Sequence, residues 1–252
     1  MAPESCQDSD VPEPPPTVVL VHSPFLGPAS LRPLADALGG HGRPTVLLDL
    51  RVTVAAAPVH ARMIGSFADA VGEAGLTEPV VLVGHSGAGP LLPAFADALE
   101  EPVAGLVFLD AGLPTPGRSW RDTAPAGLFA ALRDKSRDGL LPRWPDWFEP
   151  DPLPRLVPDT VLRAQVAEEA PEVPLAFLKE SRPSVEWTGP AAYLQLSPAY
   201  DEDAAAAKRL GWPVRRLHTH HLAAVTEPEL VADALLELLA ELAALVHLDE
   251  LG

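Results

Sequence analysis

Short apolar runs rich in β-branched residues recur along the first half of the chain. They are Val18–Val21, Val46–Leu50, Val80–Val83 and Leu106–Leu109. A half-exposed strand alternates apolar and polar residues, whereas these runs are apolar at every position except Asp49, which is typical of strands buried on both faces of a parallel sheet. The pattern therefore predicts a parallel sheet covered by helices.

Helix-like segments separate the apolar runs. Ala29–Leu38 ends at a Gly-Gly pair, His60–Ala74 ends at Gly75, and Pro90–Leu99 follows the third strand. Glycine directly after a helical pattern commonly stops the helix. Because strands and helices alternate at the interval of βαβ units, we expect an α/β fold with an open, doubly wound sheet and its reactive loops at the carboxyl ends of the strands.

The alternation is interrupted between residues 113 and 189, a stretch that holds four of the five tryptophans. We expect this stretch to be a cap or lid insertion over the sheet. The core then comprises residues 17–112 and 190–252, and its second part carries strands at Ala192–Leu196 and Val214–Leu217, a helix at about Glu202–Leu210 and a last helix. Residues 1–16 are polar and rich in proline, which predicts a disordered tail.

The third strand continues directly into Gly84-His85-Ser86-Gly87-Ala88-Gly89 and then into a helix. A serine on such a sharp turn needs a strained backbone, and small neighbours let strand and helix pass closely. Gly87 presents a backbone N–H at the start of the helix, where a developing oxyanion can be bound. The motif therefore predicts that Ser86 is the nucleophile of a serine-dependent hydrolase.

From Thr17 onward, tail and insertion excepted, the chain resembles the α/β-hydrolase superfamily. The resembling pieces are VVLVHSPFLG, VVLVGHSGAG, LVFLDAGLP and HHLAAVTEPELVADAL. The resemblance implies the α/β-hydrolase fold, a mostly parallel doubly wound sheet with a helical cap insertion. It also implies a catalytic triad in the chain order Ser, acid, His.

Three histidines compete for the role of base, and two aspartates compete for the role of acid. His221 is favoured over His218 and His220, because it begins the H-L-A segment that carries the catalytic histidine in the resembling family. The family's acid usually lies just past the penultimate strand, where Asp201 falls one or two residues late. Some members carry it after the preceding strand, at the place of Asp110, so we favour Asp110 and keep Asp201 as the alternative.

The loop after the first strand is expected to supply the second oxyanion donor. Its sequence, HSPFLG at residues 22–27, places Pro24 at the family's usual donor position, and proline has no N–H. Either the loop offers the N–H of Phe25, or Ser23 lends its hydroxyl, or the oxyanion hole is incomplete. We expect Phe25, Trp144 and Trp147 to line an apolar substrate pocket.

The amino-acid composition disfavours several classes of function. The formal net charge is -17, from 35 acidic and 18 basic residues, so the surface repels nucleic acid and anionic lipid. The apolar stretch Leu230–Val246 contains three acidic residues, which disfavours a membrane span. Cys6 is the single cysteine, so no internal disulfide forms and a reducing, cytoplasmic location is expected.

These features predict a serine hydrolase that cleaves a small, largely apolar ester, thioester or amide through an acyl-enzyme. We expect a small-molecule substrate and neither a cofactor nor a metal, because the histidines lack carboxylates or cysteines at ligand spacing. One alternative is a non-hydrolytic enzyme of the same fold, such as a lyase, a cyclase or a rearrangement enzyme. Another is a non-catalytic ligand receptor. The oligomeric state is not predicted.

Overall fold

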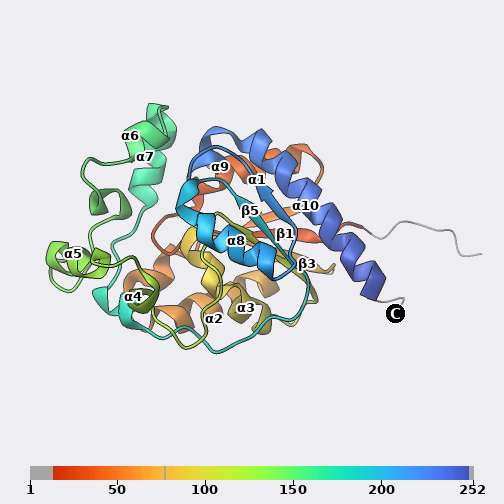
Figure 1. Cartoon of the computed structure of the whole chain (residues 1–252), viewed down its shortest axis with the longest axis horizontal. Helices are drawn as coiled ribbons and strands as arrows, with labels where there is room; N and C mark the ends of the chain where they lie inside the picture. The colour runs from red at the N-terminus through yellow and green to blue at the C-terminus, as the bar shows by residue number, and fades with distance from the viewer. Residues whose placement is uncertain (1–13, 77, 250–252) are drawn as a thin grey trace, which may run out of the picture.

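A computed structural model describes residues 14–76 and 78–249 of the chain (Figure 1). Its centre is a six-stranded sheet in the order β2-β1-β3-β4-β5-β6, with every strand pair parallel. The predicted parallel sheet is confirmed. The strands are β1 (Thr17–Val21), β2 (Thr45–Leu47), β3 (Val80–His85), β4 (Val103–Leu109), β5 (Ala191–Gln195) and β6 (Val214–Arg216).

Helices cover both faces of this sheet (Figure 1). Alternate residues of β1 belong to two different apolar clusters, one on each face, which explains why its sequence does not alternate between apolar and polar residues. The helices of the first face are α1 (Arg32–Gly40) and α10 (Pro228–Asp249), and those of the second are α2 (Val59–Glu73), α3 (Leu92–Asp97) and α8 (Asp201–Arg209).

Two helices begin with a tighter turn than the sequence predicts. A 3-10 turn, η1 (Pro28–Ser30), precedes α1, and another, η3 (Ser86–Leu91), precedes α3. Pro33 and Pro93 lie in the first turns of the two α-helices, where the missing N–H costs no hydrogen bond. Each α-helix starts one residue before its proline, a few residues later than expected.

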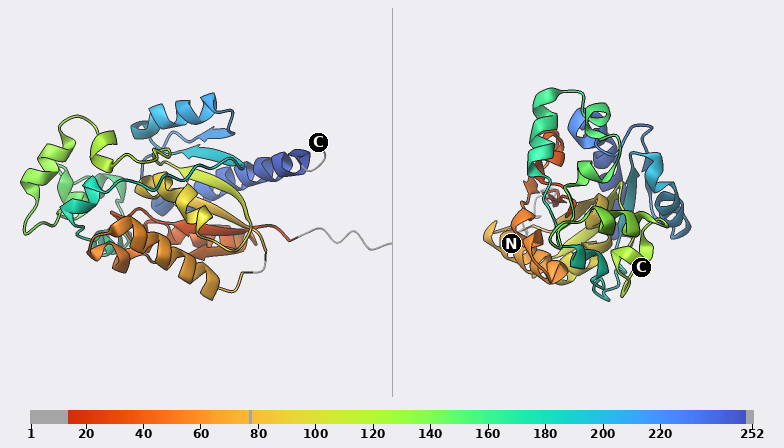
Figure 2. Two further views of the ribbon diagram at one scale, coloured as in Figure 1. Left: turned by 90° about the horizontal axis from the view of Figure 1, so that it is seen from below. Right: turned by 90° about the vertical axis from the view of Figure 1, so that its left-hand side faces the viewer.

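The segment between β4 and β5 lies beyond the carboxyl ends of the strands, at the end of the molecule opposite the start of β1 (Figure 2). It packs on the core through an apolar cluster that joins Leu153, Leu156 and Val166 to Leu26 and Leu222. Its role as a cap stays a prediction. It contains α4 (Trp120–Thr123), α5 (Leu128–Lys135), η4 (Trp144–Trp147), α6 (Leu153–Leu156), α7 (Thr160–Glu169) and η5 (Leu175–Lys179).

Two expectations concern the tail and the membrane. Residues 1–13 of the predicted disordered tail lie outside the described residues, and residues 14–16 precede β1 without regular structure. In the part of the chain that the structure describes, no helix has both the length and the apolar character needed to cross a membrane.

Candidate active site

Ser86 lies where β3 passes into η3, with a φ of +57°. Residues other than glycine rarely adopt this left-handed conformation, so tight packing must hold the turn. A Cβ on Gly84 would lie 2.9 Å from the Leu92 side chain, and one on Gly89 would lie 2.6 Å from the carbonyl oxygen of Gly112. The glycines thus let the helix approach the sheet closely, and the serine stays 8% exposed at the turn.

A chain of hydrogen bonds runs from Ser86 through His221 to Asp110. The Nε2 atom of His221 lies 3.0 Å from the Oγ of Ser86, and its Nδ1 lies 2.7 Å from the Oδ2 of Asp110. Because an ionised carboxylate only accepts hydrogen bonds, the neutral imidazole carries its proton on Nδ1. Its Nε2 is then free to accept the proton of the serine hydroxyl.

Asp110 follows β4 and is fully buried. One carboxylate oxygen accepts the backbone N–H groups of Leu196 and Ser197, each at 2.9 Å, and the other accepts the Ser197 hydroxyl at 2.7 Å. Burial alone would raise the pKa of Asp110, but the hydrogen bonds from His221 and Ser197 hold this pKa below its usual value. The carboxylate therefore stays ionised beside the imidazole.

The alternative acid, Asp201, lies at the first turn of α8 and does not contact His221. Its Oδ1 accepts a hydrogen bond of 2.6 Å from the Gln195 amide and lies 3.9 Å from the Arg216 guanidinium. Of the two aspartates, the structure brings Asp110 to the histidine.

The two other candidate histidines do not contact Ser86. His220 accepts the N–H of Leu222 at 3.3 Å and donates to the hydroxyl of Thr226 at 3.1 Å, so it holds the loop, and His218 is exposed. Among the described residues, no group of three or more His, Cys, Asp or Glu side chains is arranged to hold a metal ion.

His85, which the sequence did not identify as a site residue, contacts both the ring and the backbone of His221. The two rings stack with centroids 4.7 Å apart, and Nε2 of His85 donates to the His221 carbonyl oxygen at 3.0 Å. Burial lowers the pKa of His85 to about 3, with the nearby His221 adding to the effect. His85 is thus a neutral donor that orients the backbone of the His221 loop.

Tyr200 was also missed, and it reaches the same serine. Its hydroxyl lies 3.3 Å from the Oγ of Ser86, and its ring stacks on that of His221 with centroids 5.5 Å apart. Burial raises the pKa of Tyr200 to about 12. The sequence singles out the loop after β5 as a place for a carboxylate, but a tyrosine there belongs to no motif.

His22 fixes the loop after β1. Its Nε2 accepts the N–H of Leu50 at 3.0 Å, so its Nδ1 carries the proton and donates to the Ser23 carbonyl oxygen at 2.8 Å. Burial lowers the pKa of His22, which keeps the ring neutral. The same interaction ends β2 at Leu47 rather than at Leu50 as predicted, because the N–H of Leu50 is directed away from the sheet.

This loop packs against the start of η3. A Cβ on Gly87 would lie 3.1 Å from the Pro24 ring and 3.2 Å from the Ser23 hydroxyl oxygen. The N–H of Phe25 donates to that same oxygen at 3.3 Å. The structure therefore brings the predicted oxyanion residues together, and the Phe25 N–H already has a partner.

Of the side chains predicted to line a pocket, Trp147 packs on Phe25 and Trp144 lies beside His221. Phe177 and Trp120, which were not predicted, also surround Phe25. Its ring centroid lies 4.8 Å from that of Trp147, 5.6 Å from that of Phe177 and 6.3 Å from that of Trp120. The ring centroid of Trp144 lies 6.1 Å from that of His221. An apolar, aromatic environment thus adjoins the serine.

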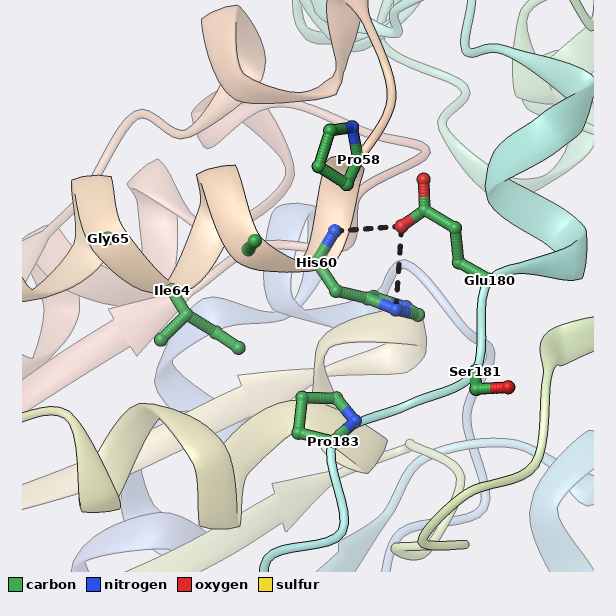
Figure 3. A pocket seen from close by; sticks show the side chains of 8 residues that line it. Pro58, His60, Ile64, Gly65, Glu180, Ser181 and Pro183 are labelled. Carbon is green, nitrogen blue, oxygen red and sulfur yellow. Dashed lines mark hydrogen bonds and ion pairs between the residues drawn. The ribbon is translucent and has the colours of Figure 1, made fainter.

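A separate cavity of about 620 Å³ opens beside the start of α2 (Figure 3). Glu180 accepts the backbone N–H groups of Val59 and His60 there, and its Oε2 lies 3.6 Å from Nδ1 of His60. The glutamate therefore caps the helix, a structural role. Ser86 does not line this cavity, whose walls are Pro58, His60, Ala61, Ile64, Gly65, Glu180, Ser181 and Pro183.

Comparison with known proteins identifies the family. The model of the Alpha/beta hydrolase family matches residues 18–234, so the chain belongs to this family. A search of curated proteins found no match.

Solved structures share the fold. An extracellular α/β-hydrolase from a Paenibacillus species has a TM-score of 0.70 and 22% identity, over 88% of this chain and 98% of that one. Polyneuridine aldehyde esterase has a TM-score of 0.63 and 18% identity, over 89% and 99%. Tomato methylketone synthase I has a TM-score of 0.64 and 15% identity, over 90% and 98%.

Proposed function

We propose that the protein is a serine hydrolase that cleaves a small, largely apolar ester, thioester or amide through an acyl-enzyme on Ser86. The observation that carries this proposal is the hydrogen-bonded chain from Ser86 through His221 to Asp110, with 3.0 Å and 2.7 Å between the bonded atoms. A serine hydroxyl is a weak nucleophile unless an adjacent base takes its proton, and this arrangement provides the base.

In the proposed mechanism, the Oγ of Ser86 attacks the substrate carbonyl while Nε2 of His221 takes the hydroxyl proton. The Asp110 carboxylate stabilises the resulting imidazolium and fixes its orientation. The imidazolium then gives the proton to the leaving group as the bond from the carbonyl carbon to that group breaks. Water, deprotonated by His221, then attacks the acyl carbon, the bond from that carbon to Oγ breaks, and His221 returns the proton to Ser86 as the acid leaves.

We assign the oxyanion hole to the N–H of Gly87 and the hydroxyl of Ser23. Pro24 has no N–H, and the Phe25 N–H donates to the Ser23 oxygen at 3.3 Å. In the described part of the chain, the Ser23 hydroxyl proton has no acceptor, so it remains available to an oxyanion. Ser23→Ala is expected to lower kcat by about 10²- to 10³-fold, as loss of one such donor typically does.

The preference for an apolar substrate rests on the aromatic side chains around Phe25 and His221. An ester as the leading substrate class is supported by the activity in the name of polyneuridine aldehyde esterase, which shares the fold. A cytoplasmic location stays a prediction.

The test is covalent labelling with a fluorophosphonate probe, followed by mass spectrometry of the labelled peptide. The wild type is expected to carry the probe on Ser86 and to hydrolyse short-chain esters. Ser86→Ala is expected to lose labelling and to lose at least about 10³-fold in kcat/KM. Ser181→Ala, which removes a serine of the separate cavity, is the matched control and is expected to keep both. Full esterase activity in Ser86→Ala would sink the proposal.

A non-hydrolytic reaction is the second candidate, and Pro24 favours it because the proline removes a donor that ester hydrolysis uses. The fold alone does not determine the reaction, since tomato methylketone synthase I, which is named as a synthase, shares it. Product analysis in heavy-oxygen water separates the two candidates, since hydrolysis incorporates the label into a carboxylic acid. The contact between Ser86 and His221 weighs against a non-catalytic receptor, in which the two side chains need not meet.

A further inference from the structure

Tyr200 ends a 3-10 turn, η6 (Pro198–Tyr200), between β5 and α8. Its hydroxyl lies 3.3 Å from the Oγ of Ser86, although 114 positions separate the two residues in the chain. The aromatic ring stacks on His221 with an interplanar angle of 23°. Tyr200 therefore touches both the attacking atom and the base of the proposed mechanism.

The direction of this hydrogen bond follows from the proton count. The single hydroxyl proton of Ser86 is directed to Nε2 of His221, so the serine oxygen can only accept from the tyrosine. In the resting enzyme, Tyr200 is thus a donor to a lone pair of Oγ. When Oγ bonds to the substrate carbon and gives its proton to His221, it becomes an ether-type oxygen and a weaker acceptor than a neighbouring oxygen that carries negative charge, so the tyrosine hydroxyl can donate to that oxygen instead.

Two oxygens flank Oγ in the tetrahedral intermediate, the oxyanion and the leaving-group oxygen. The oxyanion is assigned to the N–H of Gly87 and the hydroxyl of Ser23, which packs against Gly87. His221 delivers the proton to the leaving group, and the Tyr200 ring is stacked on it. The Nε2 atom of His221 and the Tyr200 hydroxyl lie 3.0 Å and 3.3 Å from the same Oγ. The tyrosine hydroxyl therefore lies beside the imidazole that protonates the leaving group.

We propose that Tyr200 is a further catalytic residue, which donates a hydrogen bond to the leaving-group oxygen. This inference rests on the proposed serine hydrolase function. As the bond from carbon to the leaving group breaks, its electron pair stays on the oxygen and the proton comes from Nε2 of His221. Tyr200 keeps its own proton throughout and stabilises the negative charge that builds up before the transfer is complete.

The test compares the full-length wild type with Tyr200→Phe, which keeps the stacked ring and removes only the hydroxyl. The substrates are a nitrophenyl ester and an alkyl ester of the same short acyl chain. An alkoxide needs stabilisation and a nitrophenolate does not. We therefore expect kcat/KM to fall about 10- to 100-fold for the alkyl ester and by less than about 3-fold for the nitrophenyl ester.

A merely structural role for the tyrosine lowers both rates equally, so an unchanged ratio of alkyl to nitrophenyl rates overturns the inference. If Tyr200→Phe does not fold, as judged by circular dichroism, a fluorinated tyrosine at position 200 replaces it. Its more acidic hydroxyl is a stronger donor and is expected to raise the alkyl-to-nitrophenyl ratio, and an unchanged ratio again overturns the inference.

Fluorophosphonate labelling in the same preparations separates this inference from the function on which it rests. Labelling of Ser86 in both proteins together with an unchanged rate ratio refutes the role of Tyr200 and leaves the serine hydrolase intact. Absence of labelling and of ester hydrolysis in the wild type refutes the hydrolase, and the role of Tyr200 fails with it.

Discussion

Asp110 accepts hydrogen bonds from three residues of the polypeptide, and only one of them is the histidine. Leu196 and Ser197 hold the carboxylate from the loop after β5, and His221 approaches the remaining lone pair. The carboxylate thus has a fixed orientation before the imidazole is placed against it. The tautomer of His221 depends on this charge, since an acceptor opposite Nδ1 keeps the proton there.

Replacing Asp110 by asparagine is expected to lower kcat by about 10³- to 10⁴-fold, because the amide can donate to Nδ1 and so favours the wrong tautomer. Asp201→Asn is the matched control. Asp201 contacts Gln195 and Arg216 and does not contact the imidazole. The kcat of Asp201→Asn is therefore expected to stay within about 3-fold of the wild-type value. Steady-state kinetics on one ester measures both. The reverse ranking of the two variants would identify Asp201 as the acid.

The sequence could reduce the acid to two positions but could not decide between them. Asp110 and Asp201 follow neighbouring strands, so both lie at the same edge of the sheet. The backbone N–H groups of residues 196 and 197 hold the Asp110 carboxylate in place. Every residue except proline has such a group, so the sequence does not show which carboxylate these two bind. The contact of Tyr200 with Ser86 was not predicted for a related reason, because it depends on the path of a loop.

At the scale of elements, the passage from β3 through η3 to α3 determines where the serine is held. Ser86 has a positive φ, and Gly84 and Gly89 leave space on either side of it for Leu92 and Gly112. The strain at the serine persists because strand and helix are packed on both sides of the turn. The small residues of the motif are therefore a packing requirement.

Gly89→Ala tests this requirement. The new methyl group would lie 2.6 Å from the carbonyl oxygen of Gly112 and 2.7 Å from the Cβ of Ala111, so the helix must shift. We expect a loss of about 1–3 kcal/mol in the free energy of unfolding, together with reduced esterase activity. Urea titration followed by circular dichroism measures the first quantity.

Gly65→Ala, in the middle of α2, is the matched control. A Cβ there meets nothing within 4 Å, and alanine is a better helix former than glycine. This variant is expected to gain about 0.5–1 kcal/mol. Equal effects of the two substitutions would contradict the packing argument.

Elements with a strong periodic pattern were predicted well, and those held by tertiary contacts were not. All six strands and the helices α2 and α8 lie within a few residues of their expected places. The short helices between β4 and β5 were not predicted individually. Helices of four residues, such as α4 and α6, cannot be stable alone, so their positions depend on packing against the core.

At the scale of the whole molecule, buried neutral histidines couple stability to pH. Burial lowers the pKa values of His22, His60, His85 and His220. In the unfolded chain these rings bind protons near pH 6.5, whereas the folded protein resists protonating them. Their contribution to stability is therefore complete above about pH 6.5 and is lost as the pH falls below that value.

His85→Gln isolates one such contribution, because the glutamine amide can still donate to the His221 carbonyl but does not titrate. The pKa of His85 is lowered to about 3, so the free energy of unfolding of the wild type is expected to fall more steeply between pH 6.5 and pH 5 than that of the variant. The difference in slope approaches about 1.4 kcal/mol per pH unit. Urea titrations at several pH values measure both slopes, and parallel slopes would contradict this assignment.

The segment between β4 and β5 leaves the core at the carboxyl end of β4 and re-enters it at the amino end of β5, because the two strands are parallel. These two strands are hydrogen-bonded neighbours from Leu106 opposite Ala191 to Leu109 opposite Leu194, and Asp110 ties their ends together through Ser197. A connection between parallel strands must run back along the length of the strand and needs about a dozen residues or more, and the segment between β4 and β5 is far longer than that. Changes of length beyond this return path are expected to leave the strand pairing and Asp110 in place, so we expect natural variation and protein engineering to change selectivity in this stretch.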